Sequence, residues 1–201
     1  MPLTRHTIIF DLGNVILPFD PLIPCRVLGD KCSRTAEQVR DLIYRNNLER
    51  EFEEGKINGE QFTRGVSRVL GMALKHDSFR RLWSDMFVEN KETTALIRRL
   101  APHHELMILS NTNEWHWRFA QERFQIVTEI KKAVVSYEVG ELKPHPRIYE
   151  AALATADASL PAIFIDDIEA NAEAAREHGI IGVHFVSAGQ TTSDLTALGC
   201  I

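Results

Sequence analysis

The chain has 201 residues, of which 23 are Lys or Arg and 28 are Asp or Glu, so its formal net charge is −5. This length suits one full domain with an insertion, or two small domains, and it can bury a sizeable core without disulfides. A mildly acidic chain with no basic block is a poor candidate for binding DNA, RNA or an anionic membrane surface. The composition therefore favours chemistry on a small molecule.

The cysteines and the apolar segments exclude further classes of protein. The three cysteines form no C-x-x-C pair, which argues against both a disulfide framework and a zinc site: Cys25, Cys32 and Cys200. The most apolar N-terminal stretch, residues 7–17, is interrupted by Asp11 and Asn14 and is too short for a membrane span or a signal core. We therefore expect a cytoplasmic protein with no membrane partner, either a monomer or a homodimer.

Five short runs rich in β-branched and aromatic residues predict buried strands: Thr7–Phe10, Glu105–Leu109, Ala133–Tyr137, Ala162–Ile165 and Ile181–Val186. From about residue 105 onwards, these runs alternate with segments of helical periodicity: Glu114–Phe124, Pro146–Ala156 and Glu169–His178. Such alternation predicts an α/β fold with a Rossmann-like parallel five-stranded sheet and helices on both faces. The ligand crevice of such a sheet lies beyond the carboxyl ends of its strands.

The segment from residue 17 to residue 90 offers no convincing strand and carries helix start signals instead. Thr35 with Gln38, and Asn58 with Gln61, fit capping boxes, and apolar residues at helical spacing follow each one. We therefore predict a small all-helical cap over residues 17–90, inserted directly after the first strand. The α/β core would then comprise residues 1–16 and 91–201.

Polar residues follow four of the predicted strands and should meet at one edge of the sheet: Asp11, Ser110 with Asn111, Lys143, and the adjacent pair Asp166 and Asp167. A carboxylate such as Asp11 can attack phosphorus, and several carboxylates together favour a cation such as Mg²⁺. Lys143 would neutralise charge on Asp11 and on the phosphoryl oxygens, and Ser110 would donate its hydroxyl to a phosphate oxygen. The pattern therefore predicts phosphoryl transfer.

Four segments, Phe-Asp-Leu-Gly-Asn-Val, Ser-Asn-Thr, Lys-Pro and Phe-Ile-Asp-Asp-Ile-Glu-Ala-Asn, resemble in order and spacing the four motifs of the haloacid dehalogenase (HAD) superfamily. The resemblance covers essentially the whole chain and is to the branch whose helical cap follows the first strand. It implies a Mg²⁺-dependent phosphatase that hydrolyses a small phosphorylated metabolite, a sugar phosphate being one candidate, through an aspartyl-phosphate at Asp11.

The resemblance also implies the residues that hold the metal ion and the substrate. Asp11, the backbone carbonyl of Gly13 and Asp167 would hold Mg²⁺, with Asp166 as a direct or water-mediated partner. Asn171 would support that loop. We expect five residues near the first two strand ends to bind the substrate: Gly13, Asn14, Ser110, Asn111 and Trp115. For Trp115, packing in the core is an alternative, because helical aromatic residues are usually core.

Gly13 departs from the family pattern. Most phosphatases of the family have a second aspartate at this position, which protonates the leaving group and then activates water. The segment Asp-Leu-Gly-Asn-Val nevertheless resembles a branch that includes α-D-glucose-1-phosphate phosphatases, so the glycine does not exclude activity. Asp20, at the entry to the cap, and His116, six residues after Ser110, are the candidates for a substitute acid. For His116, an exposed position on a helix is the alternative.

Two other functions are consistent with parts of this pattern. A 2-haloacid dehalogenase would use Asp11 as a nucleophile on carbon without a metal, and a non-catalytic ligand-binding protein would keep only the fold. The acidic pair Asp166-Asp167 argues against the dehalogenase, because extra carboxylates would not help attack on carbon. The retained Asp11 and Lys143 argue against a protein without catalysis.

Overall fold

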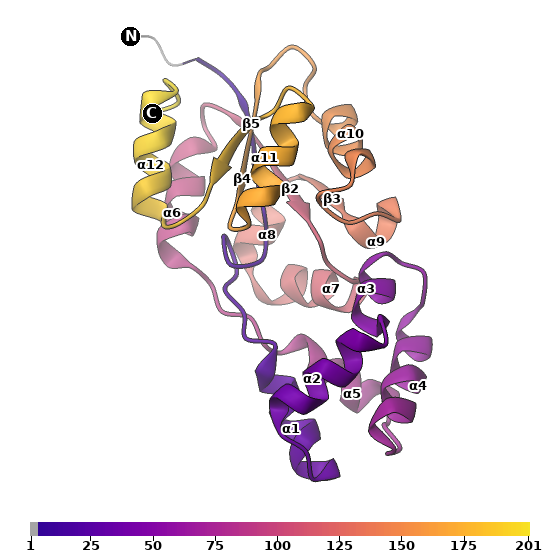
Figure 1. Cartoon of the computed structure of the whole chain (residues 1–201). Coiled ribbons are helices and arrows are strands. Elements are labelled where there is room, and N and C mark those ends of the chain that lie inside the picture. The colour runs from indigo at the N-terminus through magenta and orange to yellow at the C-terminus, as the bar shows by residue number, and fades with distance from the viewer. Residues whose placement is uncertain (1–3) are drawn as a thin grey trace.

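The computed structural model describes residues 4–201 and contains one parallel sheet of five strands in the order β3-β2-β1-β4-β5 (Figure 1). The strands are β1 (Thr7–Phe10), β2 (Glu105–Ser110), β3 (Lys132–Val135), β4 (Ala162–Asp166) and β5 (Ile181–His184). All four neighbouring pairs run parallel, and β1 lies in the centre between β2 and β4. The predicted α/β fold with a parallel five-stranded sheet is confirmed, and Asp11 follows its central strand.

Two strands end earlier than the sequence predicts. The third ends at Val135 rather than Tyr137, because the chain turns there into the short helix α9 (Ser136–Val139), which Gly140 closes with a φ of 82°. The fifth ends at His184 rather than Val186, whose side chain is 70% exposed. In both cases aromatic or β-branched residues, Tyr137 after the third strand and Phe185 and Val186 after the fifth, continue past the point where pairing with the neighbouring strand stops, so composition alone overestimates the strand length.

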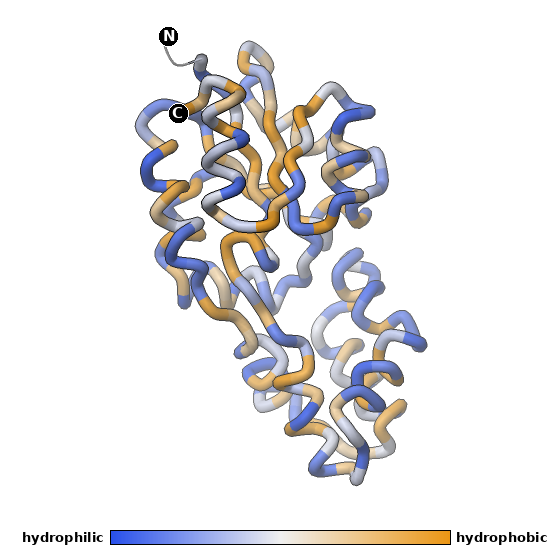
Figure 2. The backbone as a smooth tube through the Cα atoms, turned by 60° about the vertical axis from the view of Figure 1, so that its left-hand side comes forward, coloured by the Kyte–Doolittle hydropathy of each residue, from blue (hydrophilic) through white to orange (hydrophobic). Residues whose placement is uncertain are grey.

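Helices cover both faces of the sheet, as the sequence predicts. On one face Ile8 and Phe10 of β1 pack with α6 (Lys91–Leu100), α7 (Glu114–Arg123), α8 (Gln125–Glu129) and α12 (Ala188–Ala197). On the other face Ile9 packs with α10 (Pro146–Thr155) and α11 (Glu169–Glu177). This alternation along β1 is the period-two pattern of a strand that is buried on both sides. Figure 2 shows the hydrophobic residues concentrated along these strands.

The chain between β1 and α6 forms five helices beyond the carboxyl ends of the strands (Figure 1). They are α1 (Leu22–Cys32), α2 (Ala36–Arg45), α3 (Leu48–Glu53), α4 (Gly59–Leu70) and α5 (His76–Ser84). They enclose a hydrophobic cluster of their own, with Phe62 at its centre. Both predicted capping boxes, at Thr35 and Asn58, are present. None of the helices in residues 4–201 has the length and apolar character needed to cross a membrane.

Two antiparallel chain segments connect this helical group to the sheet. The outgoing segment after β1 and the returning segment before α6 form an isolated bridge between Phe19 and Phe87, whose ring centroids lie 5.6 Å apart. Val88 N–H donates to the Pro18 carbonyl at 2.9 Å, which extends the pairing. A third connection comes from α7, because Trp115 packs in the helical cluster whereas Trp117 packs against the sheet.

Candidate functional site

Three carboxylates lie together at the carboxyl edge of the sheet. Asp11 follows β1, Asp166 ends β4, and Asp167 is the next residue along the chain. One carboxylate oxygen of each lies within 4.8 Å of the other two. Three hard oxygen donors at this separation fit a divalent cation such as Mg²⁺, which takes oxygen ligands and keeps several waters. The central position of β1 is what brings Asp11 next to the residues that end β4.

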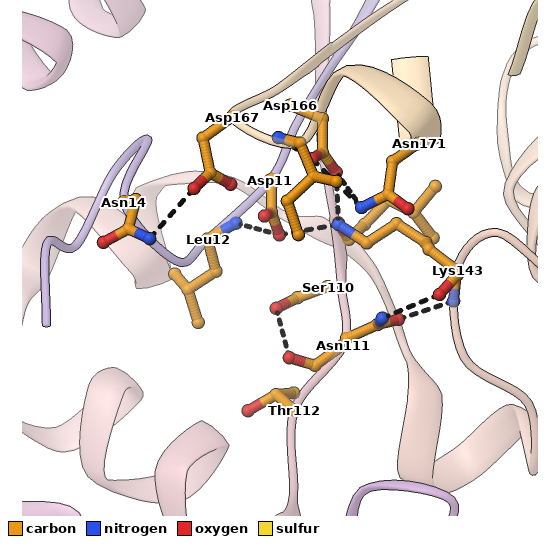
Figure 3. A network of polar contacts seen from close by, with 12 residues as sticks. Asp11, Leu12, Asn14, Ser110, Asn111, Thr112, Lys143, Asp166, Asp167 and Asn171 are labelled. Atoms are coloured by element: carbon orange, nitrogen blue, oxygen red, sulfur yellow. Dashed lines mark hydrogen bonds and ion pairs between the residues drawn. The ribbon is translucent and has the colours of Figure 1, made fainter. Parts of the chain in front are cut away.

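Lys143 lies inside this cluster (Figure 3). Its side chain is 1% exposed, and Nζ is 2.8 Å from Asp11 Oδ1 and 2.6 Å from Asp166 Oδ2. Nζ also donates to the Leu109 carbonyl at 3.1 Å. Burial by itself lowers the pKa of Lys143, but the two carboxylates outweigh this and raise that pKa above its ordinary value. Lys143 is therefore a fixed positive charge in a buried site.

The two neighbouring acids have different surroundings. Asp166 is fully buried, and both its oxygens are occupied, by the Ile168 N–H, the Asn171 amide and Lys143. Asp167 is partly exposed and accepts one hydrogen bond, from Asn14 Nδ2 at 2.9 Å. Asp167 consequently has free lone pairs for a cation, whereas those of Asp166 are largely used by the protein.

The surroundings of Asp11 change the pKa of its carboxyl group. Burial raises the pKa of its carboxyl to about 7; Lys143 lowers that pKa, and the neighbouring acids Asp166 and Asp167 raise it. The Leu12 N–H donates to Asp11 Oδ1 at 2.7 Å, so this oxygen is held by the same turn that follows β1. A cation would supply the positive charge that this carboxylate needs in order to ionise fully at neutral pH.

The turn after Asp11 leaves little room for a side chain at position 13. A Cβ on Gly13 would lie 3.0 Å from Cε1 of the Phe19 ring. The next residue, Asn14, has the left-handed φ of 55°, and its amide reaches Asp167. An aspartate in place of Gly13 would require the Phe19 ring to shift. The observed packing of Phe19 therefore depends on the glycine at position 13.

Asn111 holds the loop that carries Lys143. Its Oδ1 accepts from the Lys143 N–H at 2.7 Å, and its Nδ2 donates to the Lys143 carbonyl at 3.1 Å (Figure 3). Ser110 lies between Asn111 and the carboxylates at the end of β2, with its hydroxyl 3.4 Å from the Asn111 carbonyl. The structure thus brings together the predicted residues Asp11, Gly13, Asn14, Ser110, Asn111, Lys143, Asp166, Asp167 and Asn171.

The structure does not bring His116 or Trp115 into this cluster. His116 is 4% exposed, and both ring nitrogens have protein partners: the Trp83 carbonyl at 3.1 Å and the Asn113 amide at 3.0 Å. Burial lowers the pKa of His116 to about 4, so the ring is neutral at pH 7. The alternative of an exposed helix position for His116 is therefore wrong. Trp115 lies in the hydrophobic cluster of the helical group, edge-on to Phe52 and Phe62.

Asp20 lies at the first turn of the helical group. It is exposed, and its Oδ1 accepts from the Leu22 N–H at 2.9 Å, where it closes the turn that starts α1. The Asp20 N–H pairs with the Met86 carbonyl of the returning segment at 3.3 Å. Its described contacts are those of a turn residue.

Two acids that the sequence analysis did not select, Glu49 and Glu53, lie on one face of α3. Glu49 is 6% exposed and accepts from Asn113 Nδ2 at 3.4 Å, and its burial together with the Glu53 charge raises the pKa of Glu49 well above its ordinary value. Burial raises the pKa of Glu53 to about 7; the nearby Asp11 charge raises it as well, and Lys143 lowers it. Their spacing of four residues places them on one helix face and could have indicated a shared site, but acidic residues on solvated helices have the same spacing.

Comparisons with known proteins give relatives at low sequence identity. No family model matches the chain. The sequence is 25% identical over 181 residues to D-ribitol-5-phosphate phosphatase of Bacteroides thetaiotaomicron, covering 86% of this chain and 87% of the relative. The structure is similar, with a TM-score of 0.80, to a HAD family enzyme of the same organism in complex with magnesium and inorganic phosphate, at 24% identity over 95% of this chain and 98% of that one. A predicted HAD-like family hydrolase of Porphyromonas gingivalis has a TM-score of 0.77 at 22% identity, over 97% of this chain and 98% of that chain.

Proposed function

The chain belongs to the haloacid dehalogenase-like superfamily, and we propose that it is a Mg²⁺-dependent phosphatase of a small phosphorylated metabolite. The observation that carries the proposal is the cluster of Asp11, Asp166 and Asp167, in which the buried Lys143 forms ion pairs with Asp11 and Asp166. The relative named for D-ribitol 5-phosphate makes alditol and sugar phosphates the first substrates to test. The reaction would proceed through an aspartyl-phosphate at Asp11.

Asp11 is the proposed nucleophile because it follows the central strand and is fixed by the Leu12 N–H and Lys143. Its free carboxylate oxygen would attack the phosphorus atom, and the leaving oxygen would take the electron pair of the bond that breaks. Lys143 would balance negative charge on the phosphoryl oxygens, and the Ser110 hydroxyl would donate to one of them. Asn111 would act through Lys143, since it holds the backbone of that residue from both sides.

Asp11, Asp167 and the Gly13 carbonyl are the proposed ligands of Mg²⁺. The occupied oxygens of Asp166 support a water-mediated contact for this residue rather than a direct one. When bound, the ion would polarise a phosphoryl oxygen and neutralise the carboxylates. Asn14 and Asn171 would fix the orientations of Asp167 and Asp166, respectively.

Residues 17–90 are the proposed cap over this site. The two paired linkers at Phe19 and Phe87 and the separate hydrophobic cluster of α1–α5 support this division. A cap would exclude water from the phosphoryl group and contact the leaving group. The contacts of Trp115 and His116 with the helical group support structural roles for both residues.

A screen of phosphomonoesters tests the proposal. Purified protein should release phosphate from at least one alditol or sugar phosphate with Mg²⁺ and lose this activity in EDTA. The Asp11→Asn variant should lose at least about 10³-fold in kcat, because it removes the nucleophile. Circular dichroism and size-exclusion chromatography would verify that the variant folds. Normal turnover by Asp11→Asn would exclude the aspartyl-phosphate.

The same screen should contain 2-haloacids as a control. Release of halide without metal, and of no phosphate with metal, would establish the dehalogenase instead. A folded protein that binds Mg²⁺ and turns over neither class would establish a binding protein. The buried carboxylates disfavour the dehalogenase, since a pair of extra negative charges beside Asp11 would not assist displacement at carbon.

A further inference from the structure

The proposed reaction lacks a proton donor for the leaving oxygen. Position 13, where an aspartate would supply it, is a glycine packed under Phe19. The Asp20 carboxylate closes the turn before α1, and His116 has both ring nitrogens bound to the protein. A carboxyl group on another element near Asp11 would supply this proton.

The end of α3 is the part of the helical group that is fixed against the strand ends. The Ser136 hydroxyl, directly after β3, lies 2.7 Å from the Glu53 carbonyl and accepts from the Thr112 N–H at 2.9 Å. Gly55 follows with a φ of 66°, and a Cβ there would lie 2.2 Å from the Tyr137 carbonyl. Such a close backbone approach needs a glycine. The backbone at Glu53 is thus held by Ser136, which also contacts Thr112 in the loop after Ser110.

The surroundings of the Glu53 side chain are a second indication that this residue lies near the strand ends. Glu49 lies one helical turn earlier on the same face of α3, and it contacts Asn113 of the loop after β2. The charges that act most strongly on the Glu53 carboxylate are those of Asp11 and Lys143, ahead of that of its neighbour Glu54. The contact of Glu49 with Asn113 thus places this face of α3 toward the strand ends.

Glu53 and the adjacent acid Glu54 have different surroundings. Glu54 forms ion pairs with Arg50 at 2.9 Å and Lys56 at 2.7 Å. Within residues 4–201, no hydrogen bond or ion pair engages the Glu53 carboxylate, although the residue is partly buried. A partly buried carboxyl group without a partner, on a helix end that is fixed against the strand ends, is available to a substrate.

We propose that Glu53 is the general acid and base of the phosphatase, supplied by the cap in place of the aspartate that Gly13 replaces. This inference rests on the proposed function. In the first step Asp11 bonds to phosphorus, the bond to the leaving oxygen breaks, and that oxygen takes the Glu53 proton. In the second step Glu53 accepts a proton from the water that attacks phosphorus, and the Asp11 carboxylate leaves with its electron pair. The raised pKa of Glu53 suits both duties.

The Glu53→Gln variant separates the two steps, because it keeps the size of the side chain and cannot transfer the proton. With a poor leaving group, such as the best alditol or sugar phosphate of the screen, kcat should fall by about 10²–10⁴-fold. With p-nitrophenyl phosphate, whose leaving group needs no proton, the first step should stay fast and the second should slow. The variant should then release a burst of about one p-nitrophenolate per enzyme before slow turnover.

Glu51→Gln is the matched control, because Glu51 lies on the same short helix two residues away and points to a different side. It should show wild-type turnover and no enhanced burst. Wild-type kinetics in Glu53→Gln, or an equal loss on both esters without a burst, would overturn the role of Glu53. A wild-type protein that hydrolyses neither ester would overturn the proposed function and, with it, this assignment.

Discussion

Lys143 Nζ lies 2.8 Å from Asp11 Oδ1, and it lies still closer, at 2.6 Å, to Asp166 Oδ2 on the neighbouring strand. One ammonium group therefore joins the ends of β1 and β4. With Asp167 included, the cluster holds three carboxylates and one ammonium group, so its formal charge is −3 plus 1, or −2. A divalent cation would bring this total to zero, which gives an electrostatic reason for the cluster to bind one.

Lys143→Met should destabilise the protein strongly in EDTA. The substitution leaves two buried carboxylates without their positive partner, and removal of one member of a buried ion pair costs about 3–5 kcal/mol. Urea denaturation would measure the free energy of unfolding. Lys131→Met, at an exposed lysine, should change this free energy by less than about 0.5 kcal/mol. Equal stability of the Lys143 and Lys131 variants would contradict a structural role for the ion pairs.

Mg²⁺ should raise the unfolding midpoint of the wild-type protein. A ligand that binds only the folded state stabilises it by about 2.7 kcal/mol at 100 times its Kd. Asp167→Asn should raise the Kd for Mg²⁺, because the Asp167 carboxylate accepts one hydrogen bond from the protein and keeps other lone pairs for the ion. The variant should keep the fold, because Asp167 is partly exposed. Thermal unfolding over a series of Mg²⁺ concentrations gives the stabilisation by Mg²⁺ and the Kd for Mg²⁺. A wild-type midpoint independent of Mg²⁺ would contradict the proposed metal site.

The buried His116 should make stability depend on pH. The pKa of His116 is about 4 in the folded protein, against an ordinary value near 6.5 in the unfolded chain. Between these values the unfolded state binds a proton that the folded state does not, so stability falls as pH falls from 6.5 to 4. The loss should reach about 3 kcal/mol.

His116→Gln isolates this contribution, since Asp11, Glu49 and Glu53 titrate in both proteins. The wild-type advantage in the free energy of unfolding, measured with urea at several pH values, should shrink on acidification. It should be constant above pH 7, where His116 is neutral in both states. An advantage that stays the same from pH 7 to pH 4 would show that His116 is protonated in the folded protein.

The sequence predicts the sheet edge well because the signal there is local. Asp11 directly follows β1, Ser110 ends β2 and Asp166 ends β4, and parallel strands bring their carboxyl ends to one edge. The order of the strands then determines which of these residues meet. The contacts of Lys143 with Asp11 and Asp166 follow from this arrangement together with the hold of Asn111 on its loop.

The contribution of the helical group could not be predicted in the same way. Glu53 lies in an acidic stretch that any solvated helix could have, and its burial comes from docking of α3 on Ser136 and Tyr137, about 80 residues away in the chain. His116 was equally ambiguous, because its neighbours Trp115 and Trp117 pack in different hydrophobic clusters. Tertiary contacts between distant segments decide both cases, and local periodicity carries no information about them.

Gly55→Ala tests whether the docking of α3 matters for catalysis. The new Cβ would lie 2.2 Å from the Tyr137 carbonyl, so the end of α3 would have to move away from the strand ends, and Glu53 with it. We expect kcat for an alditol or sugar phosphate to fall by at least about 10-fold, since misplacement by about 1 Å is costly. Gly71→Ala is the matched control, because Gly71 has a similar φ of 70° but nothing within 4 Å of the added Cβ. Both variants should lose about 1 kcal/mol of stability from the left-handed backbone, but only Gly55→Ala should also lose activity. Equal activity of the two variants in the phosphate-release assay would show that catalysis tolerates a displaced α3.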